Sequence, residues 1–429
     1  MSTHFRPMKI LTLISLVLAV CFLPACGNKS AGTPAGNPTE SPAGSQRSPE
    51  SLIVWVYMKD TELAALQTVV NAYQSKTGDT VTVINFPYFE MLSKVEIAFP
   101  AGEGPDLVEF PHTDAGVWSQ AGLIVPFPTG ALSDNERSLY QASALDAFTT
   151  DGQLYGIPQI ADTVVLMYNK ALVTKPPETM GELVSMAHQL TRDDIYGFLV
   201  LDNNMWFSWC FISGYGGYIF GQQNGAYNPD DIGVFSKDTA DGMNYLMTFR
   251  NQEGLIPSDL DWNIITGKFT EGKVAMMLMN ANQAGIYQAA GVDVGIAVIP
   301  RLPNGEMPHP LLNVHGWGLN AYSTKQQAAS ELAVYLGAHL PVPLFQAGSG
   351  NIPVRNDVLT DPIIANNPDA TAAVQQVQYA QPVPNIPEMS LVWTPLNNAF
   401  DLVASGKKTT AQALLEATQA IRDAIAGQQ

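Results

Sequence analysis

The chain has 429 residues, of which 46% are apolar and only 14% are charged, and its formal net charge is −18 at pH 7. This acidic balance argues against a nucleic-acid partner, because binding to phosphates requires a basic face. At ~100–200 residues per domain, the length and the apolar content predict two domains with sizeable cores.

The N-terminal residues resemble an export signal. Two cations, Arg6 and Lys9, precede an apolar run over 10–23, which leads to Cys26 after a small residue. This order is typical of a secretory signal peptide, and the run is shorter than the ~20 residues of a transmembrane helix. The cysteine resembles that of a bacterial lipobox, in which it is acylated and anchors the mature chain to the membrane. Pro24 departs from the usual lipobox, so ordinary secretion with cleavage nearby stays open.

The next segment is rich in Gly, Ser, Pro, Asn, Thr and Ala, with few large apolar residues. Such a composition cannot bury enough surface to fold and favours a flexible spacer. We therefore expect a lipoprotein signal peptide over 1–25, a lipid-anchored tether over 26–50 and a globular part from 51 onward.

The globular part begins with a pattern of strand, helix and strand. Residues 52–57 form a continuous apolar run that predicts a buried strand. Apolar residues at helical spacing follow, and this helix is expected to end at Gly78. Residues 81–86 predict a second strand, which makes a βαβ unit with parallel strands. A third strand is expected over 106–110.

The alternation of helices and strands continues to the C-terminus. Ser133-x-x-Glu136 and Thr179-x-x-Glu182 resemble capping boxes that open helices. The fold class is therefore α/β, with two lobes that each consist of a sheet covered by helices. The remaining elements that we expect are helices over 238–252, 323–336 (ended by Gly337) and 409–426, and strands over 274–279 and 294–299.

Signals of catalysis are weak. The sequence has no G-x-S-x-G, H-E-x-x-H or Walker motif, and its histidines lack metal-ligand spacing. Asp106 and Glu109 are three apart on a predicted strand, so they point to opposite faces. Cys210 lies in an apolar context that predicts a buried thiol. We therefore expect no catalytic residue, no metal and no cofactor.

Aromatic residues are more informative. A sugar ring has an apolar face ringed by hydroxyls, so its site needs flat aromatic platforms with polar groups at their edges. Several of the seven tryptophans sit beside turns or strand ends, although each one alone is more often a core residue. They are Trp55, Trp118, Trp206, Trp209, Trp262, Trp317 and Trp393.

Over about 52–425 the sequence resembles the maltose/maltodextrin-binding proteins, which are family 1 extracellular solute-binding proteins of ABC importers. The most specific motif is Pro384-Asn385-Ile386-Pro387 followed by Trp393. The other segments that carry the resemblance are Leu52-Ile53-Val54-Trp55, Gly104-Pro105-Asp106-Leu107-Val108, Gln120-Ala121-Gly122-Leu123, Leu154-Tyr155-Gly156-Ile157-Pro158, Met167-Tyr168-Asn169-Lys170 and Gly216-Gly217-Tyr218-Ile219-Phe220.

This resemblance implies a periplasmic-binding-protein fold of the type II-like class, with two hinge-connected lobes and a central cleft. It implies a monomer that is lipid-anchored outside the cytoplasm, binds a maltodextrin-type oligosaccharide and delivers it to the permease subunits of an ABC transporter. The implied lobes are 51–160 plus 313–361 (lobe one) and 161–312 plus 362–429 (lobe two), with hinges near 159–161, 312–314 and 360–362.

The resemblance also implies ligand-binding residues. Trp393 and Trp206 match aromatic platforms of lobe two, and Asp162 matches an acid that accepts hydrogen bonds from sugar hydroxyls. Phe110 stands where a stacking Trp is expected. The remaining candidates are Tyr57, Lys59 and Asp60 in the loop after the first strand, Trp317 on the strand that re-enters lobe one, and Trp262 as a weaker one.

Three departures from the family pattern leave alternatives open. Thr113-Asp114 replaces an Asp-Arg pair, the stretch around Asn282 lacks an expected Trp, and Asn397 replaces an Arg. A receptor for a different sugar or for a non-sugar solute such as a polyamine or a peptide would share the fold. An extracellular glycosidase would share the aromatic platforms and the acids.

Overall fold

The computed structural model describes residues 47–223, 226–348 and 350–427, and Pro49–Gln429 forms one compact unit. The predicted signal peptide, Cys26 and the tether up to residue 46 lie outside the described residues. Within the described part of the chain, none of the helices has both the length and the apolar character needed to cross a membrane.

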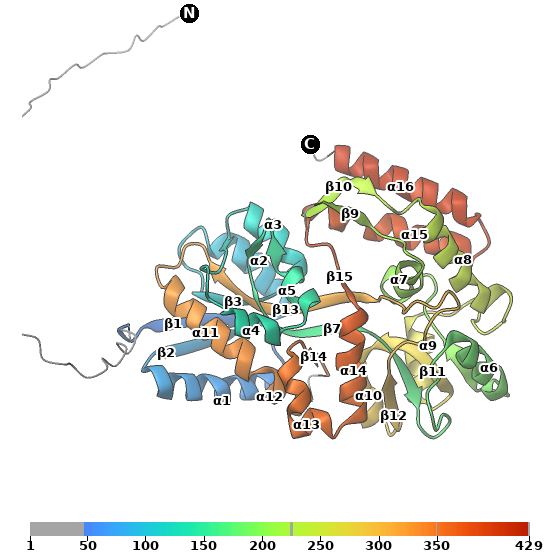
Figure 1. Ribbon diagram of the computed structural model, residues 1–429, viewed down its shortest axis with the longest axis horizontal. Helices are drawn as coiled ribbons and strands as arrows, with labels where there is room; N and C mark the ends of the chain where they lie inside the picture. The colour runs from blue at the N-terminus through green and yellow to red at the C-terminus, as the bar shows by residue number, and fades with distance from the viewer. Residues whose placement is uncertain (1–46, 224–225, 349, 428–429) are drawn as a thin grey trace, which may run out of the picture. The chain divides into compact units, whose positions relative to one another are not determined.

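The main sheet has eleven strands, and its central path runs β2-β1-β3-β13-β7-β11-β8 (Figure 1). The strands of this path are β1 (Ser51–Val56), β2 (Thr80–Asn85), β3 (Leu107–Pro111), β7 (Ile157–Asn169), β8 (Tyr196–Leu199), β11 (Val274–Asn280) and β13 (Leu311–Asn320). Four further strands pair with β7 or β13, namely β4 (Ile124–Val125), β12 (Val294–Ala297), β14 (Ile352–Pro353) and β15 (Gln381–Pro382). Two small sheets pair β5 (Thr149–Thr150) with β6 (Gln153–Leu154), and β9 (Phe220–Gln223) with β10 (Ala226–Ile232).

Sixteen α-helices and four 3₁₀ helices occur in the described residues. The α-helices up to the middle of the chain are α1 (Asp60–Thr77), α2 (Tyr88–Ala98), α3 (Ala115–Gln120), α4 (Asp134–Leu139), α5 (Ala142–Ala147), α6 (Met180–Leu190), α7 (Met205–Gly214) and α8 (Lys237–Asn251). The later ones are α9 (Trp262–Thr270), α10 (Ala284–Ala289), α11 (Gln326–His339), α12 (Pro341–Gln346), α13 (Pro362–Ala365), α14 (Pro368–Tyr379), α15 (Trp393–Ala404) and α16 (Thr410–Ala426). The 3₁₀ helices are η1 (His112–Asp114), η2 (Ala281–Gln283), η3 (Asn356–Thr360) and η4 (Pro387–Leu391).

Strand β7 joins two parts of the sheet. Its 13 residues are all buried. The segment from Ile157 to Thr163 pairs with β13, and the segment from Val164 to Asn169 pairs with β11 and β12. One continuous strand therefore changes partners directly after Asp162 and Thr163.

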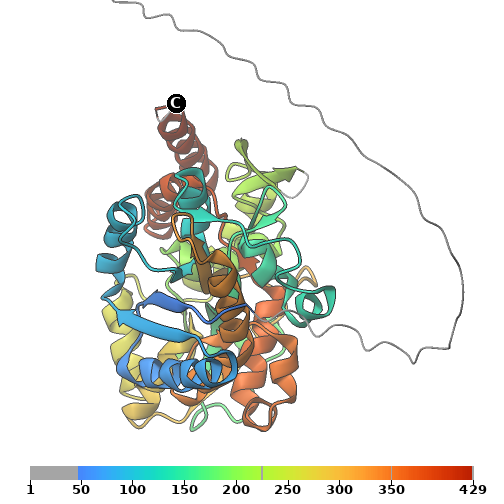
Figure 2. The same ribbon diagram turned by 90° about the vertical axis from the view of Figure 1, so that its left-hand side faces the viewer.

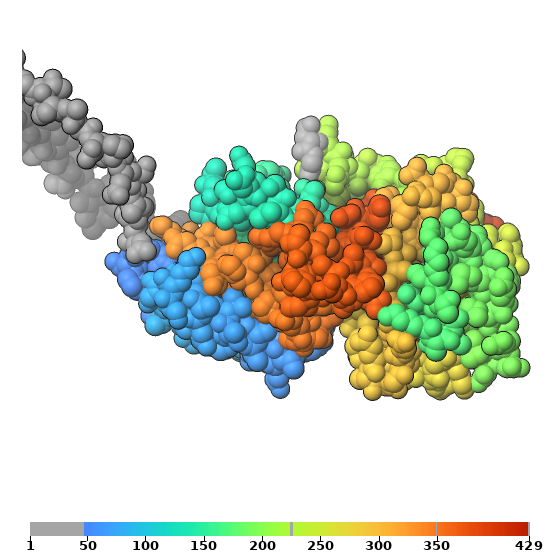
Figure 3. All heavy atoms as spheres, turned by 60° about the horizontal axis from the view of Figure 1, so that its bottom comes forward, coloured from blue at the N-terminus to red at the C-terminus, as the bar shows by residue number. Residues whose placement is uncertain are grey.

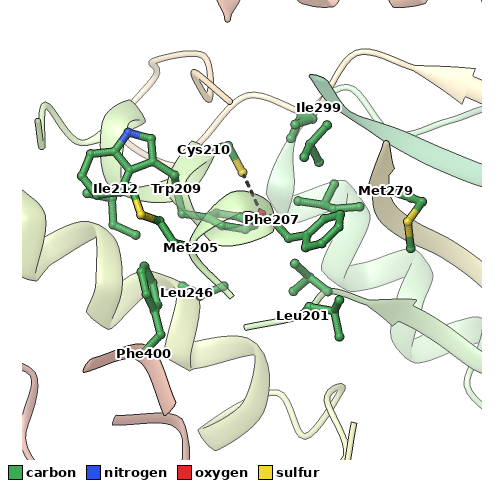
Figure 4. Packing of buried hydrophobic residues seen from close by; sticks show 14 of the residues in the cluster. Leu201, Met205, Phe207, Trp209, Cys210, Ile212, Leu246, Met279, Ile299 and Phe400 are labelled. Carbon is green, nitrogen blue, oxygen red and sulfur yellow. Dashed lines mark hydrogen bonds between the residues drawn. The ribbon is translucent and has the colours of Figure 1, made fainter. Parts of the chain in front are cut away.

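Two separate apolar cores lie on either side of this change of partners. We call the one that includes Val54, Leu107 and Leu332 the first core, and the one that includes Phe198, Trp209 and Phe400 the second core. Figure 2 shows α1 beside β1 and β2 on the side of the first core. Figure 4 shows part of the second core, where residues of α7 lie beside Leu246 of α8 and Phe400 of α15.

Helix α14 contacts both parts. Its residues Ala370, Val374 and Val377 belong to the first core. The Asp369 carboxylate accepts from the Ile296 main-chain N–H of β12 at 2.9 Å. The Gln376 side-chain oxygen accepts from the Ile299 main-chain N–H, shortly after β12, at 2.8 Å. Figure 3 shows the orange segment that contains α12 to α14 between the blue start of the fold and its yellow and green parts.

Most of the expected elements are confirmed, including the strands at β1, β2, β3, β11 and β12 and the helix caps at Ser133 and Thr179. The predicted end of a helix at Gly337 is wrong, because α11 continues to His339. A Cβ at Gly337 would lie 2.7 Å from Ile157 and from the Tyr140 hydroxyl. This glycine therefore allows close packing of α11 on β7 and does not end the helix. Cys210 is buried, as its context predicts, and burial raises its pKa.

Candidate functional site

Asp162 lies where β7 changes partners, opposite Asn313 of β13. Each of these two side chains has an Oδ1 atom without a hydrogen-bond partner among the described residues. Burial raises the pKa of Asp162 to about 7, although hydrogen bonds from the Thr163 main chain and from Asn282 oppose the shift. Directly opposed residues of antiparallel strands have neighbouring side chains. Two buried acceptors therefore lie side by side, and a ligand that donates hydrogen bonds would satisfy them.

Tyr57 continues this polar region from the end of β1. Its hydroxyl oxygen lies 2.5 Å from Nδ1 of His315, and the other ring nitrogen of His315 lies 3.3 Å from Nδ2 of Asn313. The Tyr57 ring also packs edge-on against Tyr88 of α2, with the ring centroids 4.9 Å apart. A connected row of polar side chains thus leads from β7 across β13 to the end of β1.

Two acids whose pKa values are raised by burial lie near Tyr57. The Glu109 carboxylate is 3% exposed and accepts from the Tyr57 main-chain N–H at 3.2 Å. Burial raises the pKa of Glu109 to about 8. Burial, with a smaller effect of the Glu96 charge, raises the pKa of Asp114 to about 6. Burial therefore favours the protonated form of both acids, and Glu109 is mostly uncharged near neutral pH.

Trp206 lies half-buried in the first turn of α7, over the second core. The Asn204 side chain caps this helix by accepting from the Trp206 main-chain N–H at 3.0 Å. The indole N–H of Trp206 donates to Oδ1 of Asn280 at 2.6 Å. Asn280 pairs with Val164 on β7, two residues from Asp162. A partly exposed indole with its polar edge fixed therefore lies near the two acceptors.

Trp393 is the first residue of α15 and is also half-buried over the second core. The preceding motif is anchored to the other half of the molecule. The Asn385 side-chain amide donates to the Ala147 carbonyl at 2.9 Å, and Nε2 of His112 donates to the Val383 carbonyl at 2.9 Å. A Cβ at Gly116 would lie 1.9 Å from the Asn385 carbonyl oxygen. Hydrogen bonds from side chains to main-chain carbonyls thus hold the segment that leads to Trp393.

The structure shows what surrounds the three positions that depart from the family pattern. Oδ1 of Asn397 accepts from the Met205 main-chain N–H at 2.8 Å, in the first turn of the helix that carries Trp206. The Asn282 hydrogen bonds to Asp162 hold that carboxyl in place. Thr113 is partly buried in η1. Two of the three changed positions therefore support residues of the site.

Two of the predicted platforms lie inside the first core. Phe110 and Trp317 have no exposed surface. The Phe110 ring stacks on Trp118 at 5.1 Å between centroids, and its atoms would meet a Cβ at Gly318 at 2.6 Å. A ring that stacks on a sugar needs one face free of protein contacts. These two rings have no such face, so they pack in the core of this structure and do not have the expected role as sugar platforms.

The remaining predicted residues lie at the surface. Lys59 and Asp60 are exposed at the start of α1, where the Glu62 carboxylate accepts from the Lys59 main-chain N–H at 2.9 Å. Trp262 is 42% exposed and its ring centroid lies 5.9 Å from that of Phe207. Of the nine predicted positions, Tyr57, Asp162, Trp206 and Trp393 are thus the ones that are held by contacts and are neither fully buried nor at the open surface.

A cavity of about 750 Å³ lies elsewhere, and none of the predicted site residues lines it. Its walls come from α5, from α7, from β9 and β10, and from the segment of β15 that leads into the family motif. They include Asp146, Tyr218, Tyr227, Gln381 and Asn385. This cavity lacks the unpartnered acceptors and the half-buried indoles described above, so we place the candidate site at β7 and not here.

The sequence interpretation missed Asn313, His315 and Asn280. Asn313 and His315 alternate with apolar residues on one strand, which places their side chains on one face. Polar residues at this period within a buried strand are the signal that could have identified them. Asn280 carries no such signal, because its role depends on the distant Trp206.

The chain belongs to the bacterial extracellular solute-binding protein family, whose model matches residues 68–372. The fold class and the family resemblance drawn from the sequence are confirmed. The galactooligosaccharide-binding protein of Bacillus subtilis (strain 168) is 30% identical over 409 residues, which are 93% of this chain and 96% of that protein. The maltodextrin-binding protein MdxE of the same organism is 27% identical over 95% of this chain and 96% of its own length.

Solved structures show the same two-lobed fold. A cyclo/maltodextrin-binding protein complexed with maltotetraose has a TM-score of 0.83 and 32% identity, over 89% of this chain and 98% of that one. The extracellular solute-binding protein of Staphylococcus aureus in complex with maltose has a TM-score of 0.80 and 30% identity, over 88% and 98%. Both have ligands whose hydroxyls carry hydrogen-bond donors.

Proposed function

We propose that this chain captures maltodextrin-type oligosaccharides outside the cell and delivers them to the permease subunits of an ABC transporter. The observation that carries the proposal is the pair of unpartnered buried acceptors, Asp162 Oδ1 and Asn313 Oδ1, near the half-buried indole of Trp206. Sugar hydroxyls would satisfy the acceptors, and the apolar face of a pyranose would cover the indole. The relatives and solved structures that bind maltodextrins support the same ligand class.

In this proposal the ligand binds between lobe one (51–160 plus 313–361) and lobe two (161–312 plus 362–429). The binding residues are Tyr57, Asp162, Trp206 and Trp393, with Lys59 and Asp60 at the edge. Ligand that contacts both lobes would favour the closed arrangement over the open one. The partner change of β7 near the proposed hinge at 159–161 supports this arrangement, since a single strand there joins both parts of the sheet.

The proposal includes a membrane anchor and excludes catalysis. Acylation of Cys26 would hold the chain at the outer face of the membrane, and relatives from Streptococcus pneumoniae that are named solute-binding lipoproteins support this. The site would return the sugar intact. Its acids are tied to Tyr57, Asn282 and the strands, and the relatives are named as binding proteins and not as enzymes.

Isothermal titration of the purified mature chain tests the proposal. Maltose, maltotriose and maltotetraose should each give saturable heat, with affinities near the micromolar range (about −8 kcal/mol). Chromatography after long incubation should recover the sugar unchanged. Absence of heat with every maltodextrin would contradict the proposal, and appearance of shorter sugars would indicate a glycosidase.

A galactooligosaccharide is the second candidate ligand. The relative that binds it is 30% identical over 93% of this chain. Asn397, which replaces an expected Arg, accepts from the Met205 main-chain N–H and cannot form the bidentate contacts that an Arg would offer to a maltodextrin. A β-linked galactotriose in the same titration decides between the two sugars, and a polyamine such as spermidine serves as the cationic comparison.

A further inference from the structure

The hydroxyl of Tyr57 takes part in a directed chain of hydrogen bonds. His315 lies between Tyr57 and Asn313, with its Nδ1 at 2.5 Å from the Tyr57 oxygen and its Nε2 at 3.3 Å from Nδ2 of Asn313. His315 and Asn313 are both on β13, two residues apart, while Tyr57 comes from the end of β1. The three side chains therefore form a row of hydrogen bonds from β13 to the end of β1, which we call the relay.

The chemistry of the three groups sets the direction of this relay. An amide nitrogen can only donate, so Nε2 of His315 must accept from Asn313. Burial lowers the pKa of His315 to about 4, which keeps the imidazole neutral with a single N–H group. That N–H is then on Nδ1 and donates to the Tyr57 oxygen. The hydroxyl proton of Tyr57 is consequently not used in the relay and can be donated to a ligand.

The groups nearby complete a pattern of one donor and two acceptors. Asp162 Oδ1 and Asn313 Oδ1 lack partners in the described part of the chain, and they lie on neighbouring strands. A hydroxyl group both donates and accepts, so it can use the Tyr57 proton and the acceptors together. An ammonium group only donates, and it would leave the Tyr57 proton without an acceptor.

We propose that Asn313 and His315 are positioning residues that hold Tyr57 as a hydrogen-bond donor toward the ligand, and that this favours hydroxyl-bearing solutes over cationic ones. This inference rests on the proposed function for its ligand, since a neutral sugar is the class of molecule that the relay selects. His315 acts through Tyr57, which contacts the ligand, while Asn313 orients His315 through its amide N–H and also offers Oδ1 to the ligand.

The first test measures the relay itself and needs no ligand. Imidazole ¹⁵N shifts of the ligand-free protein should show a neutral His315 with its proton on Nδ1. In the Asn313→Asp variant the new carboxylate can only accept, so the proton should move to Nε2 and Tyr57 should donate to Nδ1. A wild-type His315 protonated on Nε2 would overturn the inference, whatever the ligand of the protein is.

The second test measures the consequence for binding. Titration with maltotriose should show affinity about five- to tenfold lower in Tyr57→Phe, in His315→Phe and in Asn313→Asp. In the Tyr57→Phe background the other two changes should have no further effect, because the donor is already absent and Asn313→Asp keeps an acceptor oxygen for the ligand. Additive losses would overturn the inference, since they would mean that Asn313 and His315 act independently of Tyr57.

Matched controls separate this result from damage to the fold and from failure of the proposed function. His339→Phe changes a histidine that packs on Tyr335 in α11, and it should leave the affinity unchanged. Unfolding midpoints identify any variant that has lost its fold. If the wild-type chain binds no maltodextrin, the proposed function fails while the proton position on His315 still decides the relay.

Discussion

The two sides of the candidate site differ in their chemistry. The side next to the first core holds titratable groups, among them Glu109, Asp114 and His315, whose pKa values are shifted by burial toward the neutral form. The side next to the second core holds two half-buried indoles, of which that of Trp206 donates to Asn280, while Asn397 accepts from the Met205 main-chain N–H at the start of the same helix. One side can therefore respond to pH, while the other provides apolar surface that pH does not change.

This difference has a physical origin in how each side is built. On the first side, Asp106 directly before β3 accepts from the Ile53 main-chain N–H, and Glu109 within β3 accepts from the Tyr57 main-chain N–H. These two carboxyls therefore satisfy main-chain N–H groups of β1 and of the residue that follows it. On the second side, the first turns of α7 and α15 present large side chains over an apolar core. Sugar binding needs both kinds of surface, because a pyranose has an apolar face and polar edges.

The largest effect should come from a residue that belongs to the fold and not to the site. Phe110→Ala removes a fully buried ring from the first core and should lower the free energy of unfolding by about 3–5 kcal/mol. Urea denaturation measures this loss. Phe89→Ala is the control, since this ring is 79% exposed and its loss should change stability by less than about 0.5 kcal/mol. A stable Phe110→Ala variant with strongly reduced sugar affinity would return Phe110 to the binding surface.

The next effect tests the apolar side. Trp393→Ala should weaken maltotriose binding by about 2 kcal/mol, roughly 30-fold, because the indole is expected to cover a sugar face. Calorimetric titration measures the change. Phe235→Ala alters another exposed aromatic residue, 50% accessible to solvent, and should leave the affinity as it is. Equal affinities in wild type and Trp393→Ala would remove this indole from the site.

The titratable side predicts a dependence of stability on pH. Burial raises the pKa of Glu109 from 4.5 to about 8 and that of Asp162 from 3.8 to about 7. Above their ordinary pKa values the unfolded chain ionises freely while the folded chain holds the protons, so stability falls as pH rises toward 8. His112 and His315, with pKa values lowered to about 4, oppose this trend only below about pH 6.5.

The free energy of unfolding should therefore fall by about 1–3 kcal/mol between pH 6.5 and 8.5. Urea denaturation at several pH values measures this slope. Glu109→Gln keeps the acceptor for the Tyr57 N–H and removes the ionisation, so its slope should be flatter. Glu103→Gln changes an exposed residue and should keep the wild-type slope. A wild-type stability that rises over this range would mean that Glu109 is ionised in the folded protein.

The same two sides show what the sequence could and could not predict. Trp206 follows a helix cap that is set by the neighbouring residue Asn204, and Trp393 follows a sequence motif that could be recognised without the fold, although its anchoring contacts are distant in the chain. Phe110 and Trp317 lie on strands β3 and β13, and which face of a strand is buried depends on pairing between segments about 200 residues apart in the chain. Asn313 and His315 could be placed on one face of a strand, but their partner Tyr57 could not be identified without the fold.

The smallest effect concerns the position where an Arg was expected. Oδ1 of Asn397 accepts the Met205 N–H, which is one of the N–H groups that a helix start leaves without an internal partner. Asn397→Ala should lower the free energy of unfolding by about 1 kcal/mol, and Asn397→Asp should retain most of it because a carboxylate also accepts. Since α7 carries Trp206, maltotriose affinity in Asn397→Ala should fall by no more than about threefold. Unchanged stability together with a large loss of affinity would instead indicate that Asn397 contacts the sugar directly. The side of the site next to the second core would then contain a polar ligand contact as well as the two indoles.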